Sequence, residues 1–217
     1  MSPKKKLVEI CHKVYSKGFV TAYDGNVSCR TSNNTVLITR SGICKGDITE
    51  KDIVEIDLEG KSLSGKHKIS TEHKIHIYAY QKRKEVNAVV HCHPTYATAF
   101  ALIGEGLDKH YLPEVFLTIG RVPLCKYATP STVGVHKSLD PYIDYSWAML
   151  LQNHGAVSLG KSLDDAYFKM EKLEHASKII FLARLIGKPS ELSKKNINQI
   201  LEISESTYGI VLNTRNI

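Results

Sequence analysis

Three histidines of this chain stand where they could hold one metal ion. His91 and His93 end an apolar run, and residues i and i+2 of an extended strand project to the same side. Cys92 would then point to the opposite face and is not expected to be a ligand. A third imidazole is available at His154, in the segment 152–155, which also follows an apolar run. Three histidines and one open position form the ligand set of a catalytic zinc site, although a polar role at a strand end remains the alternative for each histidine.

A carboxylate that could act as a general base precedes these histidines in the chain. Glu72 is predicted in the first turn of a helix capped by Ser70 and Thr71, and this helix leads into the strand of His91. Beside a metal, a carboxylate can take a proton from a carbon acid. The alternative is that Glu72 only interacts favourably with the helix N-terminus. His76, one turn later on the same face, is predicted to support the site or the core rather than to bind metal.

Short polar segments could form a cradle for an anion. They are residues 25–28, residues 39–42 and the pair Ser70-Thr71. Backbone N–H groups in glycine turns and at helix starts bind phosphate, and Arg40 could add positive charge. Each segment alone is a weak signal.

Composition limits the class of protein and its partners. The 217 residues include 29 Lys+Arg and 22 Asp+Glu, a net charge of +7, with 42% hydrophobic residues, as in ordinary globular proteins. Basic residues are spread along the chain, so we expect neither a nucleic-acid nor a membrane partner. No apolar run is long enough to span a bilayer, and no secretory signal is expected. Five scattered cysteines indicate free thiols in a reducing compartment, so a cytoplasmic location is predicted.

Helices and strands are expected to alternate in one α/β domain covering residues 1–217. The pattern predicts helices over 5–17, 70–81, 94–103, 162–186 and 193–206. It predicts strands over 26–30, 35–39, 52–57, 85–91, 121–127, 148–152 and 156–159. Asn33-Asn34 is expected to turn a hairpin between the first two strands.

Five motifs, taken in order, resemble the class II aldolase/adducin family, and most closely its L-fuculose-phosphate aldolase branch. They are Ala22 with Gly25–Ser28, Leu37–Thr39 with Ser41-Gly42, Ser70–Glu72 with His76 and Tyr80, Asn87–His91 with His93, and Gln152–Gly155. The resemblance extends over nearly the whole chain. It implies a three-layer α/β/α sandwich with a mainly antiparallel central sheet, and a homotetramer with active sites between subunits.

The resemblance also implies roles for individual residues. His91, His93 and His154 match zinc ligands, with Mn²⁺ or Co²⁺ as alternative ions, and Glu72 matches the acid/base carboxylate. Asn26, Ser41, Gly42, Ser70 and Thr71 match the positions that bind the substrate phosphate. Tyr111 matches a tyrosine that a neighbouring subunit lends as proton donor, and Tyr208 lies in a C-terminal tail, 208–217, that could move over the site.

The implied reaction is cleavage of a ketose 1-phosphate to dihydroxyacetone phosphate and an aldehyde. L-Fuculose 1-phosphate and related 5-deoxy- or methylthio-pentulose 1-phosphates are the expected substrates. The role of Arg40 is open, because these aldolases often carry proline at its position.

Other members of the family leave three alternatives. A sugar-phosphate 4-epimerase is disfavoured because that branch tends to have Asp where this chain has Glu72. A methylthioribulose-1-phosphate dehydratase would use a later glutamate, near Glu114, and lacks the equivalent of Glu72. A non-catalytic, adducin-like interaction module would have a broken set of metal ligands.

Overall fold

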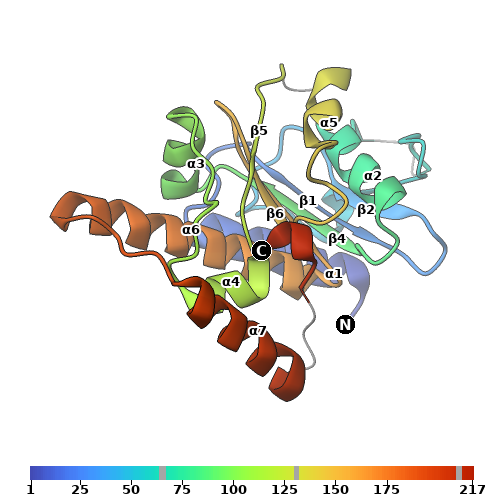
Figure 1. Ribbon diagram of the computed structural model, residues 1–217. Coiled ribbons are helices and arrows are strands. Elements are labelled where there is room, and N and C mark those ends of the chain that lie inside the picture. Colours follow the sequence, from blue (N-terminus) through green and yellow to red (C-terminus); the bar gives the residue numbers. More distant parts are fainter. Residues whose placement is uncertain (64–66, 130–131, 209–211) are drawn as a thin grey trace.

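A seven-stranded sheet forms the centre of the computed structural model, which describes residues 1–63, 67–129, 132–208 and 212–217 (Figure 1). Its strands are β1 (Asn26–Arg30), β2 (Val36–Thr39), β3 (Ile53–Ile56), β4 (Ala88–Cys92), β5 (Leu124–Cys125), β6 (Ala148–Leu151) and β7 (Gly155–Gly160). They lie in the order β3-β2-β1-β4-β7-β6-β5. Neighbours are antiparallel except β5 and β6, which pair in parallel. The predicted mainly antiparallel sheet is therefore confirmed.

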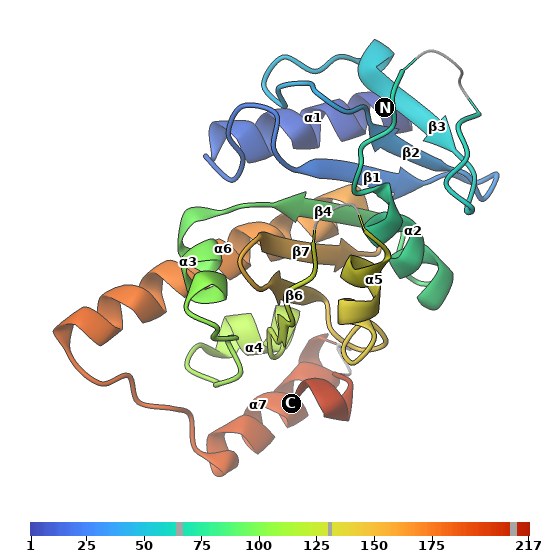
Figure 2. The same ribbon diagram turned by 90° about the horizontal axis from the view of Figure 1, so that it is seen from above.

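Helices cover both faces of this sheet. The helices are α1 (Pro3–Ser16), α2 (His73–Lys82), α3 (Thr95–Leu102), α4 (Pro113–Ile119), α5 (Val133–Leu139), α6 (Leu163–Ile186) and α7 (Lys194–Tyr208), with short 3₁₀ turns at Glu50–Asp52 and Thr214–Asn216. Figures 1 and 2 show α3 and α6 on one side of the sheet and α2 and α5 on the other. Helix α7 packs outside the layers, against α4. The predicted three-layer sandwich is thus confirmed.

The strands divide their side chains between two apolar cores, because successive residues of a strand point to opposite faces. Ala88, Val90 and Cys92 join the core under α1, α3 and α6, whereas Val89 joins the core under α2 and α5. His91 therefore lies on the face that α2 covers. Cys92 points away from it, as the strand pattern predicts.

Most predicted elements are present, and the differences have simple causes. The turn around Asn34, whose φ is 60°, joins the predicted hairpin of β1 and β2. The predicted strand over 121–127 is reduced to β5, since Pro123 has no N–H to donate to a ladder. Helices α4 and α5 were not predicted, because seven residues are too few for a clear helical period.

The C-terminal residues pack beside α4. The side-chain amide of Asn216 donates to the carbonyl of Ile119 at 2.8 Å, and the Asn216 carbonyl accepts from the N–H of Arg121. Residues 209–211 of the predicted tail lie outside the described residues. Among the helices that are described, none has the length and apolar content needed to cross a membrane.

Candidate metal-dependent active site

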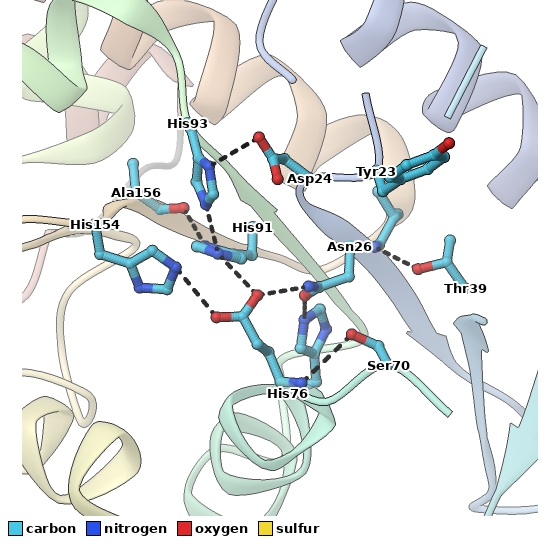
Figure 3. A network of polar contacts seen from close by, with 12 residues as sticks. Tyr23, Asp24, Asn26, Thr39, Ser70, His76, His91, His93, His154 and Ala156 are labelled. Carbon is cyan, nitrogen blue, oxygen red and sulfur yellow. Dashed lines mark hydrogen bonds and ion pairs between the residues drawn. The ribbon is translucent and has the colours of Figure 1, made fainter. Parts of the chain in front are cut away.

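The structure brings three histidines to one point (Figure 3). His91 is in β4, His93 follows that strand, and His154 is in the turn that enters β7. Antiparallel pairing of β4 with β7 places the end of one strand beside the start of the other. The three rings have centroids 4.7 to 5.0 Å apart, and one ligand nitrogen of each lies within 4.8 Å of the others.

The geometry of these imidazoles fits a bound divalent cation. Nδ1 of His91 lies 2.9 Å from the carbonyl oxygen of Ala156, so it carries the proton and leaves the Nε2 lone pair free. The Nε2 atoms of His91 and His93 are 3.2 Å apart. Two nitrogens bound to one tetrahedral zinc lie about 3.3 Å apart, given Zn–N bonds of about 2.05 Å. Burial, together with His91 and His154, lowers the pKa of His93 to about 4, whereas at His91 the Glu72 carboxylate outweighs burial and raises the pKa.

Glu72 adds negative charge to this cluster. Its Oε2 lies 3.3 Å from Nε2 of His91, and its Oε1 lies 3.1 Å from Nε2 of His154. Burial alone would raise the pKa of Glu72, but His91 and His154 outweigh burial and hold that pKa well below its usual range. Apart from this contact with His154, the buried Oε1 atom has no hydrogen-bond partner. An ionised carboxylate beside three imidazoles is a favourable environment for a cation.

The sequence predicts Glu72 in the first turn of a helix, and this prediction is wrong by one position. The helix begins at His73, and Glu72 takes the preceding N-cap position with φ −100° and ψ 11°. The Ser70 hydroxyl accepts the N–H of Glu72 at 3.4 Å instead of capping a helical N–H. This local turn directs the carboxylate of Glu72 toward the sheet.

A pocket of about 170 Å³ opens beside Glu72 and His93. The five predicted phosphate-binding residues all line it, together with residues that the sequence analysis did not assign to the site. The first set is Asn26, Ser41, Gly42, Ser70 and Thr71, and the second includes Tyr23, Asp24 and Lys45.

Two basic residues also border this pocket. Arg40 Nε donates to Asp52 Oδ1 at 2.7 Å. The buried ammonium of Lys45 donates to the carbonyls of Ile43 and Tyr23, at 2.8 and 3.1 Å. Two cationic side chains therefore border the pocket, of which Arg40 is paired with Asp52, and the carboxylates of Asp24 and Glu72 line the same pocket. Lys45, only three residues after Gly42, could have been suspected from the sequence.

Gly155 allows the close approach of β7 to His93. A Cβ atom there would lie 2.5 Å from His93 Cδ2 and 2.6 Å from the carbonyl oxygen of Cys92. We expect Gly155→Ala to lower the free energy of unfolding by about 1–3 kcal/mol and to reduce the metal content. Thermal denaturation and metal analysis test this, with Gly187→Ala as control because a Cβ at Gly187 meets no atom within 4 Å. Unchanged stability and metal content in Gly155→Ala would contradict the expectation.

Other predicted residues lie away from the histidines of the same chain. Tyr111 borders a small apolar cavity with Val115 and Ile180. Glu114 borders a larger one, of about 910 Å³, with Lys172. Tyr208 is the last residue of α7. Within one chain, therefore, neither Tyr111 nor Glu114 lines the pocket beside Glu72.

Comparisons with known proteins show the family of this chain. The family model described as "Class II Aldolase and Adducin N-terminal domain" matches residues 5–181. The chain is 36% identical over 178 residues to an L-fuculose phosphate aldolase of Methanococcus vannielii, covering 81% of this chain and 93% of the relative. It is 33% identical over 184 residues to a 3-oxo-tetronate 4-phosphate decarboxylase of Pectobacterium atrosepticum, covering 82% and 84%.

Solved structures show the same likeness. An L-fuculose 1-phosphate aldolase superposes with a TM-score of 0.85 at 30% identity, covering 93% of this chain and 96% of the other. YgbL of Klebsiella pneumoniae, described as a putative aldolase/epimerase/decarboxylase, has a TM-score of 0.84 at 27% identity, covering 91% and 96%. With the family model matching most of its length, this chain belongs to the class II aldolase and adducin N-terminal domain family.

Proposed function

We propose that this protein is a zinc-dependent aldolase that cleaves a ketose 1-phosphate to dihydroxyacetone phosphate and an aldehyde. L-Fuculose 1-phosphate and related 5-deoxy- or methylthio-pentulose 1-phosphates form the substrate class. The observation that carries the proposal is the arrangement around the pocket, where Glu72 and His93 share one cavity with the five predicted phosphate-binding residues.

The metal would be held by His91, His93 and His154, with Mn²⁺ or Co²⁺ as alternatives to Zn²⁺. When bound, such an ion polarises a substrate carbonyl and stabilises the negative charge that develops on its oxygen. The convergence of the three ring nitrogens supports this assignment. It also disfavours a non-catalytic, adducin-like role, which predicts a broken ligand set.

The phosphate would be bound by the hydroxyls of Ser41, Ser70 and Thr71, the backbone at Gly42, and Asn26. Ser70 and Thr71 precede the N-terminus of α2, where backbone N–H groups favour an anion. Arg40 and Lys45 add positive charge at the same pocket. Fixing the phosphate keeps the reacting carbons aligned with Glu72.

Proton transfer at carbon is the task proposed for Glu72. In the condensation direction, Glu72 removes a proton from C3 of dihydroxyacetone phosphate, and the electron pair left at C3 forms the new bond to the aldehyde carbon. Oε2 of Glu72 already accepts a hydrogen bond from Asn26 at 3.0 Å, so Oε1 is the oxygen placed to take the proton. In cleavage the same oxygen returns the proton to C3.

The aldehyde oxygen would receive its proton from Tyr111 of a second copy of this chain. Tyr111 borders a different cavity from Glu72 within one chain, which supports an active site completed between subunits. A homotetramer of this kind, in the cytoplasm, is part of the proposal. The five cysteines are all free thiols, as a reducing compartment favours.

A second candidate is decarboxylation of a sugar-acid phosphate. The 33% identical relative named 3-oxo-tetronate 4-phosphate decarboxylase favours it, and Arg40 and Lys45 could attract a substrate carboxylate. Loss of carbon dioxide leaves the electron pair on carbon just as loss of an aldehyde does, so Glu72 could protonate that carbon in both reactions. The epimerase alternative has less support because Glu72 is present. The dehydratase alternative has less support because Glu114 borders another cavity.

One substrate panel distinguishes these reactions. Purified protein is incubated with a series of ketose 1-phosphates and, separately, with a 3-oxo-tetronate 4-phosphate. From a ketose 1-phosphate we expect release of dihydroxyacetone phosphate, measured by coupled reduction. From the 3-oxo-tetronate 4-phosphate we expect at most slow release of carbon dioxide. Carbon dioxide from the second substrate without dihydroxyacetone phosphate from the first would replace the aldolase assignment by the decarboxylase. Water loss from methylthioribulose 1-phosphate as the main activity would favour the dehydratase.

A further inference from the structure

A buried chain of hydrogen bonds leads from Tyr80 to Glu72. Figure 3 shows the part of this chain that contains His76 and Asn26. The Tyr80 hydroxyl lies 2.6 Å from Ser28 Oγ, and Ser28 Oγ lies 2.7 Å from His76 Nδ1. His76 Nε2 bonds to Asn26 Oδ1, and Asn26 Nδ2 donates to Glu72 Oε2 at 3.0 Å. We call these five residues the relay.

The relay follows from the periods of a helix and a strand. Asn26 and Ser28 are two residues apart in β1, so they share the face that α2 covers. Glu72, His76 and Tyr80 are spaced by four residues, so they form one row along α2. The strand residues Asn26 and Ser28 therefore alternate with the helix-side row of Glu72, His76 and Tyr80 along the relay.

Each donor in the relay has only one consistent direction. The Asn26 NH₂ group donates to Glu72, so the Asn26 oxygen faces His76 and accepts from it. His76 then carries its proton on Nε2 and accepts on Nδ1. Ser28 donates to that Nδ1 and accepts from the Tyr80 hydroxyl. A flipped Asn26 amide would put two acceptor oxygens together at Glu72.

Burial makes these directions persistent. Ser28 and His76 are 0% exposed, and Tyr80 is 1% exposed, so water does not compete for their hydrogen bonds. Burial also lowers the pKa of His76 to about 3, despite the nearby charge of Glu72. At neutral pH His76 therefore has one N–H and one lone pair, as the relay requires.

We propose that Tyr80, Ser28 and His76 are positioning residues that hold the Asn26 amide, and through it the Glu72 carboxylate, in the orientation needed for proton transfer at Oε1. This inference rests on the proposed function of Glu72. It adds a second role for Asn26, whose amide contacts both Glu72 and His76 while the residue lines the phosphate pocket. None of its three outer residues lines that pocket, so they act on it only through Asn26 and Glu72.

Single substitutions in the zinc-loaded protein test the relay. We expect Ser28→Ala to lower kcat by about 10- to 100-fold, because a small misplacement of a catalytic group has effects of this size. Tyr80→Phe, which removes only the hydroxyl, should lower kcat by about threefold or more. In both variants zinc content should stay within about twofold of wild type and kcat should fall by more than KM rises, and Ser28→Thr, which keeps a hydroxyl, should recover most of the activity.

Matched controls separate positioning from general loss of packing. Ser158 is another buried strand serine, whose hydroxyl donates to the carbonyl of Ala166 at 2.8 Å. Tyr78 lies on α2 and donates its hydroxyl to Asp140 at the surface. Ser158→Ala and Tyr78→Phe should keep wild-type kcat.

The tautomer of His76 provides a readout that does not depend on activity. Imidazole ¹⁵N and ¹³C shifts of the zinc-loaded protein should show His76 neutral with the proton on Nε2, and Ser28→Ala should shift the Nδ1 resonance as its donor is lost. A proton on Nδ1 in the wild type would overturn the relay. Wild-type kcat in both Ser28→Ala and Tyr80→Phe, in an active enzyme, would overturn it as well. Absence of aldolase and decarboxylase activity in the wild type would instead refute the proposed function, while the tautomer still tests the relay itself.

Discussion

Glu72→Gln is expected to abolish proton exchange at C3 of dihydroxyacetone phosphate while the protein keeps its metal and its fold. Glutamine has the shape of glutamate, and its amide oxygen can still accept from Asn26 Nδ2, as Glu72 Oε2 does at 3.0 Å. An amide is not a base at neutral pH, so the group at Oε1 can no longer take a proton. The loss of exchange should be about 10³-fold, within the range of general acid–base catalysis.

Proton exchange isolates this step from cleavage. Dihydroxyacetone phosphate is incubated with enzyme in deuterium oxide, and loss of the C3 proton signal is followed by NMR. Glu114→Gln serves as the control, because Glu114 is an exposed carboxylate that borders another cavity. Exchange at the wild-type rate in Glu72→Gln would remove Glu72 from its proposed role. Loss of water elimination in Glu114→Gln, with methylthioribulose 1-phosphate as substrate, would support the dehydratase instead.

Loss of the metal is expected to have the largest effect on activity. Wild-type protein should contain about one zinc per chain, and His154→Ala should contain less than about one tenth of that. The activity of this variant should fall by about 10⁴-fold, because no residue of the pocket replaces the Lewis acid. His154 is the most suitable ligand to change, since it lies in a turn and its side chain is 12% exposed. His91, at 0% exposed, is part of the sheet interior.

Metal analysis and reconstitution measure this effect. Chelation should inactivate the wild type, and added Zn²⁺, Mn²⁺ or Co²⁺ should restore activity to different extents. His175→Ala is the matched control, because His175 is an exposed histidine of α6 outside the cluster. A zinc content far below one per chain in active wild-type protein would refute the zinc assignment.

Much of the site could be predicted because it depends on local periods. His91 and His93 project together because they are two residues apart at a strand end, and the alternation that buries Cys92 on the other face is visible in the sequence. His154 was proposed because it follows a second apolar run, and the polar segments because they contain glycine turns or a helix start; the resemblance then implied their individual roles. The helices and strands were predicted for the same reason, since long periodic segments carry a strong signal, whereas their arrangement in a three-layer sandwich was implied by the resemblance.

The remaining features depend on contacts between distant segments. The relay joins Ser28 to His76 and Tyr80, and its existence follows from how α2 lies across β1. The helix start at His73 is set by the turn that directs Glu72 toward the histidines, and Ser70 and Thr71 offer a capping signal that this turn overrides. Lys45 becomes part of the pocket only because its loop folds against the carbonyl of Tyr23.

The arrangement of the three histidines also affects how the protein folds. His91 and His93 end β4, whereas His154 belongs to the turn between β6 and β7, so the cluster exists only after β7 has paired with β4. A cation that binds this cluster binds the folded chain and not the unfolded one, and its binding free energy adds to the free energy of unfolding. For such a cation, occupancy of the site and completion of the central sheet would be one linked equilibrium, and the ion would act as a reversible crosslink between the end of β4 and the turn before β7.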